Sequence, residues 1–136
     1  MKFLVFISCC ICLNFSTKID DKIESIKVYK TNFNNEPIAD VGCDDFYGSF
    51  IDLIDTFDIS DNVLQYKILH IIRTAKPYKV KPYSKDPDTR ARMFIYYKSG
   101  KVDSLCFGAF RQFVLNNNTL ELPDDKLIKI LIGLEK

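Results

Sequence analysis

Residues 90–107, which read RARMFIYYKSGKVDSLCF, decide the fold predicted for this chain. β-branched and aromatic residues fill both halves of the stretch, and residues 98–101 separate them with Gly100 at a turn position that favours positive φ. Two further strand-prone runs, residues 110–115 and 119–122, lie on either side of three consecutive asparagines. The C-terminal half therefore predicts a hairpin that continues into an antiparallel meander.

Helical and strand-like periodicities extend this prediction outward from the hairpin. The apolar residues of segment 46–57 fall on one helical stripe, and a second helix begins with Ser60 as its N-cap. A third helix follows Pro123, while alternation between positions 23 and 31 predicts a strand. We expect a single globular α+β domain, residues 17–136, in which a small antiparallel sheet packs against about three helices.

The N-terminal residues predict export. After Met1 and Lys2, 11 of the 13 residues from position 3 to position 15 are apolar, which matches a signal peptide of residues 1–16 and is short for a membrane span. One alternative is a lipoprotein signal, with a lipidated cysteine at position 9, 10 or 12. Another is a buried N-terminal strand of a cytosolic protein. The expected location is secreted or periplasmic, with membrane attachment only through lipidation.

Two cysteines, Cys43 and Cys106, lie outside the predicted signal peptide. An even number of cysteines is what an oxidising compartment favours, so we predict a disulfide bond between these two residues. The alternative is a pair of independent buried thiols, because free cysteine is among the most buried side chains. Such a bond would tie the first predicted helix to the sheet.

Few residues of the sequence are suited to catalysis or metal binding. His70 is the only histidine, and its helical spacing from Tyr66 places it on the flank of a helix. Four aspartates between positions 52 and 61 recur every third residue, but they lack the alternating spacing of a calcium loop and favour a solvated acidic face. Zinc-site spacings and glycine-rich phosphate loops are absent. We expect no metal and no cofactor.

Charge is unevenly distributed along the sequence. Residues 73–101 hold nine basic and two acidic side chains, whereas residues 17–72 carry a net charge of −6 and residues 17–136 sum to zero. A basic segment rich in tyrosine suits an anionic partner, because cations attract it and aromatic rings add contact area. The alternative is that this segment complements acidic helices within the fold. The predicted binding face consists of Lys79, Lys81, Tyr83, Arg90, Arg92 and Tyr96.

These observations favour a small exported, non-enzymatic binding protein, for example an inhibitor or immunity-type protein that acts on another protein. The expected partner is a protein or an anionic surface ligand, and nucleic acid is disfavoured because the domain has no overall positive charge. The alternatives are an envelope-associated structural lipoprotein and a hydrolase of unknown substrate. The basic residues of the face are predicted at the surface, with Arg92 on the same strand face as Phe94 and Tyr96.

Overall fold

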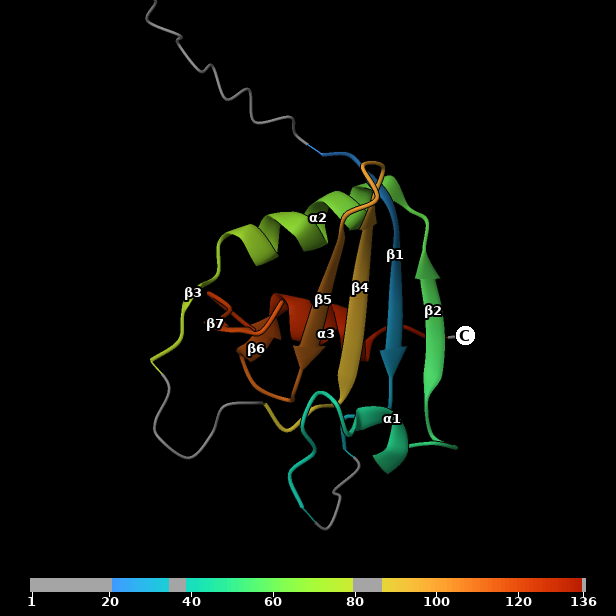
Figure 1. The fold of residues 1–136 in the computed structure, drawn as a ribbon, viewed down its shortest axis with the longest axis vertical. Coiled ribbons are helices and arrows are strands. Elements are labelled where there is room, and N and C mark those ends of the chain that lie inside the picture. Colours follow the sequence, from blue (N-terminus) through green and yellow to red (C-terminus); the bar gives the residue numbers. More distant parts are fainter. Residues whose placement is uncertain (1–20, 35–38, 80–86, 136) are drawn as a thin grey trace, which may run out of the picture.

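The computed structural model describes residues 21–34, 39–79 and 87–135, which build one antiparallel sheet (Figure 1). Its seven strands follow the order β2-β1-β4-β5-β6-β7-β3, and every neighbouring pair is antiparallel. In chain order the elements are β1 (Ile23–Lys30), α1 (Phe46–Ser49), β2 (Asp55–Ile59), α2 (Asn62–Arg73), β3 (Lys76–Pro77), β4 (Ala91–Tyr97), β5 (Val102–Phe107), β6 (Gln112–Leu115), β7 (Asn118–Glu121) and α3 (Lys126–Ile132).

The predicted fold class, a small sheet packed against about three helices, is wrong. The sheet dominates the structure and takes strands from both halves of the chain, whereas α1 has four residues and α3 has seven. β1 pairs with β4, with Ile26 opposite Ile95, so the N-terminal strand joins the sheet beside the C-terminal hairpin. Pairing between segments so distant in sequence leaves no trace in local periodicity, and the prediction therefore underestimated the sheet.

The largest local error is the helix predicted over residues 46–57. Only α1 is helical there, and the segment then turns and forms β2 at the edge of the sheet. Phe57 and Ile59 have the strand period of two, and they pair with Val28 and Ile26 of β1. The helical stripe included Phe57 but ignored Ile59, which is buried in the core. Burial against β1 outweighs the helical spacing of this segment.

The hairpin and the turns after it are confirmed. β4 and β5 pair from Ala91 opposite Phe107 to Tyr96 opposite Val102. Gly100 in the connecting turn has φ +87°, the left-handed conformation that glycine adopts without steric cost. In the tight turn between β6 and β7, Asn116 and Asn117 take positive φ values of 47° and 68°, as asparagine does more readily than most residues.

One face of the sheet packs against α2 and α3. α2 begins at Asp61, whose side chain accepts a hydrogen bond from the backbone N–H of Leu64, one residue beyond the predicted N-cap. In Figure 1, β4 and β5 run in front of α3, which lies behind the sheet. The buried core between these layers includes Ile26, Val28, Met93, Ile95, Leu105, Phe107, Ile68, Ile72, Leu127 and Leu131.

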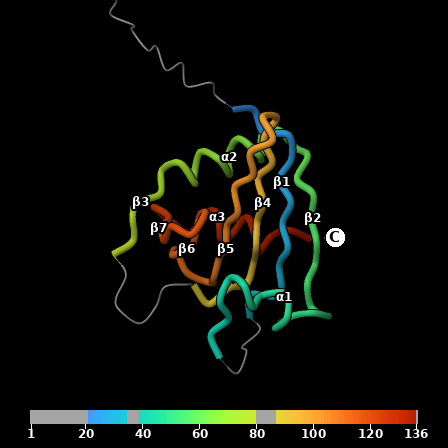
Figure 2. The backbone as a smooth tube through the Cα atoms, viewed as in Figure 1, coloured from blue at the N-terminus to red at the C-terminus, as the bar shows by residue number. Residues whose placement is uncertain are grey.

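Among the described helices, α1 is the one on the opposite face of the sheet, where it lies at the lower end of β1 and β4 in the tube view (Figure 2). We call this side the open face. Strand alternation and register place on it Lys27 and Tyr29 from β1, the side chains at positions 92, 94 and 96 of β4, and Ser104 of β5. Within the described ranges no helix is long and apolar enough to span a membrane. Residues 1–16, predicted as a signal peptide, fall outside those ranges.

Candidate binding surface

A cluster of one arginine and three aromatic rings occupies the lower half of the open face. We call it the Arg92 cluster; its members are Tyr29, Tyr47, Arg92 and Phe94. The guanidinium carbon of Arg92 lies 5.5 Å from the ring centroid of Tyr47 and 5.2 Å from that of Phe94. Tyr29 meets the edges of both rings, with centroids 5.6 Å and 6.0 Å away. Both distances are typical of favourable edge-to-face aromatic pairs.

The cluster joins elements that are distant in sequence. Tyr29 lies on β1 directly opposite Arg92 on β4, and Phe94 follows on the same side of β4. Tyr47 comes from α1, where Phe46 and Phe50 are buried against the sheet while Tyr47 retains 37% exposure. The buried phenylalanines hold α1 in place, so the Tyr47 ring is fixed over Arg92 and still faces solvent.

The Arg92 guanidinium has no acidic partner in the described part of the chain. Its Nη2 donates to the hydroxyl of Ser104 at 3.1 Å, while its Nε is buried without a hydrogen-bond partner there. Among the described residues, the faces of two rings balance its charge, an interaction worth about 0.5–1 kcal/mol near a surface. Lys27, the nearest described lysine of the open face along β1, instead pairs with Asp58 at 3.5 Å.

The phenol of Tyr47 interacts electrostatically with the Arg92 charge. Burial raises the pKa of the Tyr47 phenol above its ordinary value, the Arg92 charge opposes this rise, and the phenols of Tyr29 and Tyr96 add to it. Tyr47 therefore lies within electrostatic range of Arg92 and of two other phenols. Tyr47 therefore keeps its proton at neutral pH, because its pKa lies above the ordinary phenol value near 10. The Arg92 cluster thus offers a cation beside a neutral hydroxyl donor.

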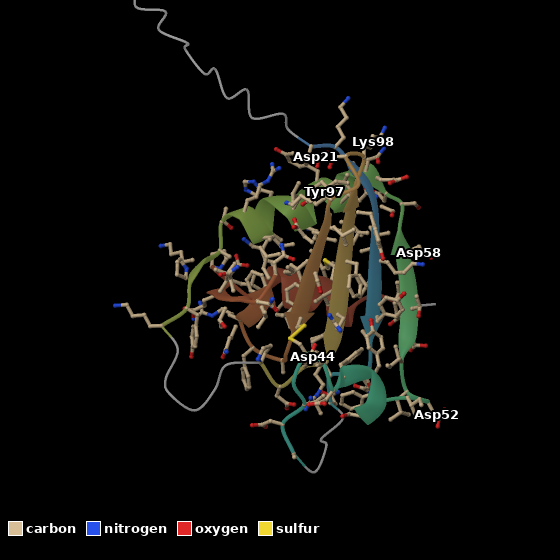
Figure 3. The ribbon with its side chains drawn as sticks, viewed as in Figure 1. Asp21, Asp44, Asp52, Asp58, Tyr97 and Lys98 are labelled. Atoms are coloured by element: carbon tan, nitrogen blue, oxygen red, sulfur yellow. A yellow bond between two sulfur atoms is a disulfide. The ribbon has the colours of Figure 1, made fainter. Side chains whose placement is uncertain are left out.

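A disulfide between Cys43 and Cys106 ties the segment before α1 to β5, and this geometry is compatible with the predicted pairing (Figure 3). The Cα atoms of the two cysteines are 5.8 Å apart, and 63 positions separate them in sequence. Cys106 is the register partner of Arg92 on the neighbouring strand. The covalent link therefore holds α1 and Tyr47 beside the guanidinium on the open face.

Arg90 is buried, and its predicted surface position is wrong. It retains 5% exposure, and two of its nitrogens bond the two carboxylate oxygens of Asp88, each at 2.6 Å. The guanidinium also lies 5.7 Å from the ring centroid of Phe50, and Asp88 accepts the backbone N–H of Val41 at 3.0 Å. Arg90 therefore fastens the segment before α1 to the sheet and offers little to a partner.

The other predicted face residues are scattered. Tyr96 is half-buried on the open face, four positions beyond Arg92 on β4. Lys79 is exposed in coil after β3, at the opposite edge of the sheet, and Lys81 and Tyr83 lie outside the described residues. The structure thus unites Arg92 and Tyr96. The sequence-based prediction included neither Tyr29 nor Tyr47. The position of Tyr29 in an alternating strand could have identified it, whereas Tyr47 is identified only by where α1 lies in the folded structure.

The histidine and the regularly spaced aspartates singled out in the sequence lie apart from one another in the described residues. His70 is exposed on α2, where its ring stacks on that of Tyr66 at 6.4 Å between centroids. The regularly spaced aspartates between positions 52 and 61 have separate roles: Asp58 pairs with Lys27, and Asp61 caps α2. In residues 21–34, 39–79 and 87–135 no three His, Cys, Asp or Glu side chains group as metal ligands.

A cavity of about 760 Å³ lies elsewhere, between the β6–β7 hairpin and the start of α3. Its charged residues are largely neutralised within the fold, because Arg111 pairs with Glu121 at 3.0 Å and Asp124 pairs with Lys126 at 2.8 Å. We favour the Arg92 cluster over this cavity as the binding site, because a cation without an acidic partner among the described residues is the stronger sign of a ligand.

Comparison with known proteins found no matching family, curated protein or solved structure.

Proposed function

We propose that this chain is a small exported, non-enzymatic binding protein whose open face contacts another protein. The single observation that supports this most is the Arg92 cluster: an arginine without an acidic partner in the described chain, held among three half-exposed aromatic rings. Tyrosine and arginine are enriched among the residues that carry most of the energy of protein interfaces.

The rigidity of this surface fits an inhibitor or immunity-type role. β1 and β4 are bonded along their length, and Cys43–Cys106 fixes α1 against β5. A surface that is already ordered loses little conformational entropy when a partner binds, which favours tight association. Such a protein needs complementarity to its target and no catalytic group, in keeping with the exposed position of His70.

Export is supported by two observations. Disulfides form and persist mainly in oxidising compartments, and Cys43 and Cys106 lie at disulfide distance with Cα atoms 5.8 Å apart. The apolar run at positions 3–15 has the length of a signal peptide. Mass spectrometry of the protein from its native host should find a chain that starts after about Ser16, or a lipidated cysteine. An intact Met1 would contradict export.

Capture of partners from extracts of the native host tests the binding surface. The protein is compared with a variant that removes two open-face rings, Tyr47→Ala with Tyr96→Ala. The matched control removes two exposed side chains of α2, Val63→Ala with Tyr66→Ala, which retain 78% and 69% exposure in the parent. We expect the open-face variant to lose the partner and the α2 variant to retain it, with both melting like the parent. A partner lost only by the α2 variant would refute the proposal.

A further inference from the structure

We infer that the Arg92 cluster is a carboxylate-binding subsite, which receives an Asp or Glu side chain of the partner protein. This inference rests on the proposed function and names the chemistry that the open face recognises.

The free donors of Arg92 fit a carboxylate. A guanidinium carries five N–H donors in one plane, and Ser104 accepts only one of those on Nη2. Nη1 makes no hydrogen bond within the described part of the chain, so Nη1 and the second hydrogen of Nη2 form a fork. Such a fork matches the two oxygens of a carboxylate, and charge-assisted pairs of this kind are about twice as strong as neutral hydrogen bonds.

The comparison with Arg90 adds a reason for an acidic ligand. The Nε atoms of both arginines are buried without a hydrogen-bond partner among the described residues, so the two side chains differ in what their Nη atoms bind. The contrast with Arg90 is informative, since Asp88 supplies that second arginine with both oxygens of a carboxylate. A ligand carboxylate would give Arg92 what the chain itself gives Arg90.

The single positive charge of Arg92 favours a carboxylate over a phosphate as the ligand. Arg92 is a single cation, and Lys27 further along the face is already paired with Asp58. Phosphorylated peptides are recognised by clusters of arginines, and nucleic-acid binding requires the neutralisation of several phosphates. One unpaired guanidinium therefore matches a ligand with one negative charge.

The rings and hydroxyls around Arg92 favour a protein as the source of that carboxylate. Tyr47 and Phe94 exclude water from two sides of the guanidinium, which strengthens an ion pair formed there. Ile51 and Leu53, which follow α1 in sequence, are exposed apolar side chains at 77% and 58% exposure. An acidic side chain surrounded by apolar residues complements this arrangement.

Side-chain NMR with short peptides tests the subsite directly. The probes are an end-blocked hexaglutamate peptide, its hexaglutamine counterpart and inorganic phosphate, each titrated into the full protein labelled with ¹⁵N. We expect the glutamate peptide to shift the Nε–Hε signal of Arg92 with a dissociation constant on the order of 1 mM, about −4 kcal/mol, and the glutamine peptide to leave it unchanged. The variants are followed by the backbone amide signals of β1 and β4 around position 92: Arg92→Gln should abolish the peptide-induced shifts, and Arg92→Lys should weaken binding at least tenfold because lysine lacks the fork.

The control variant is Arg111→Gln, which removes an arginine that already pairs with Glu121 and should leave the titration unchanged. Equal binding of both peptides, tighter binding of phosphate than of glutamate, or no shift at Arg92 up to ~10 mM peptide would overturn the inference. Partner capture with Arg92→Gln separates the two proposals. A partner lost by the Tyr47/Tyr96 variant but fully retained by Arg92→Gln would leave the proposed function standing and the carboxylate subsite refuted.

Discussion

Arg90 and Arg92 lie two positions apart on the same side of the sheet, yet the chain surrounds them differently. Arg90 is buried and grips both oxygens of Asp88, which precedes it by two residues. Arg92 is half-buried between two rings and has no such carboxylate among the described residues. Identical side chains on one side of the sheet thus meet two environments, one closed by a carboxylate of the chain and one partly open to solvent.

This difference shows how a cation acquires its role. A guanidinium that receives a carboxylate from its own loop joins two segments of the fold, as Arg90 joins the segment before α1 to β4 through Asp88 and Val41. A guanidinium held only by rings remains able to pair with an external acid. Predictions that perturb the two arginines and the link between them can break or sharpen this distinction.

Removal of the disulfide should have the largest effect on stability. The bond holds the segment that contacts Arg90 through Asp88 and Val41, and it holds α1, which carries Tyr47 beside Arg92. Replacing Cys43 and Cys106 together by serine removes a link that closes 63 residues, and a native bond of this kind contributes about 2–4 kcal/mol. We expect urea unfolding to show a loss in that range, with reduced wild-type protein matching the variant. A loss below about 0.5 kcal/mol would show that Phe46 and Phe50 hold α1 without the bond.

Removal of the Asp88 carboxylate should be next in size. Asp88→Ala leaves the buried Arg90 charge unpaired and deprives the Val41 N–H of its acceptor. Breaking a buried pair costs about 3–5 kcal/mol, but the Asp88 side chain is 36% exposed, so we expect about 2–3 kcal/mol. Asp58→Ala is the matched control, because its pair with Lys27 is 71% exposed at the aspartate and should contribute below about 1 kcal/mol. Equal losses in the two variants would contradict a structural role for Arg90.

These two arginines also mark how far sequence reasoning reached. The hairpin, α2 and the Cys43–Cys106 pair were predicted correctly because turn residues, helical periodicity and cysteine parity are local or compositional signals. β2 was missed because its pairing with β1 competes with a helical stripe that ends at Phe57. Burial of Arg90 was missed although Asp88 stands two residues before it, because adjacency in sequence does not reveal which arginine is covered.

The candidate site was found only in part for the same reason. Arg92 and Tyr96 share one strand and could be grouped from alternation alone. Tyr29 and Tyr47 reach them through strand pairing and through the packing of α1, and both depend on contacts between segments far apart in the chain. Local charge density pointed to residues 73–101 as a whole. Within the described part of this range, Arg92 is the basic residue that packs against Tyr47 and Phe94.

Arg92 itself should matter little for stability. Arg92→Gln removes two ring contacts and one bond to Ser104, which together are worth about 1 kcal/mol or less at a partly exposed site. We therefore expect its urea midpoint to stay near that of the wild type, well above that of Asp88→Ala. A loss of 2 kcal/mol or more would mean that Arg92 is as structural as Arg90, and the contrast between them would fail.

The smallest expected effect is a difference in acid sensitivity between the two arginine environments. Burial raises the pKa of Asp88, but hydrogen bonds from Arg90 and from the Val41 N–H, together with the Arg90 charge, hold it below its usual value. A carboxyl whose pKa is lower in the folded state stabilises the fold above its unfolded pKa of about 4, and this contribution is lost as the pH falls through the folded value. Asp103, which binds Asn116, also has a lowered pKa, so some acid sensitivity persists without Asp88. Urea unfolding between pH 6 and pH 2 should show a shallower loss of stability for Asp88→Asn than for the wild type, while Arg92→Gln follows the wild-type curve because no described carboxylate pairs with Arg92. Parallel flattening in both variants would mean that Arg92 shares an acid with Arg90.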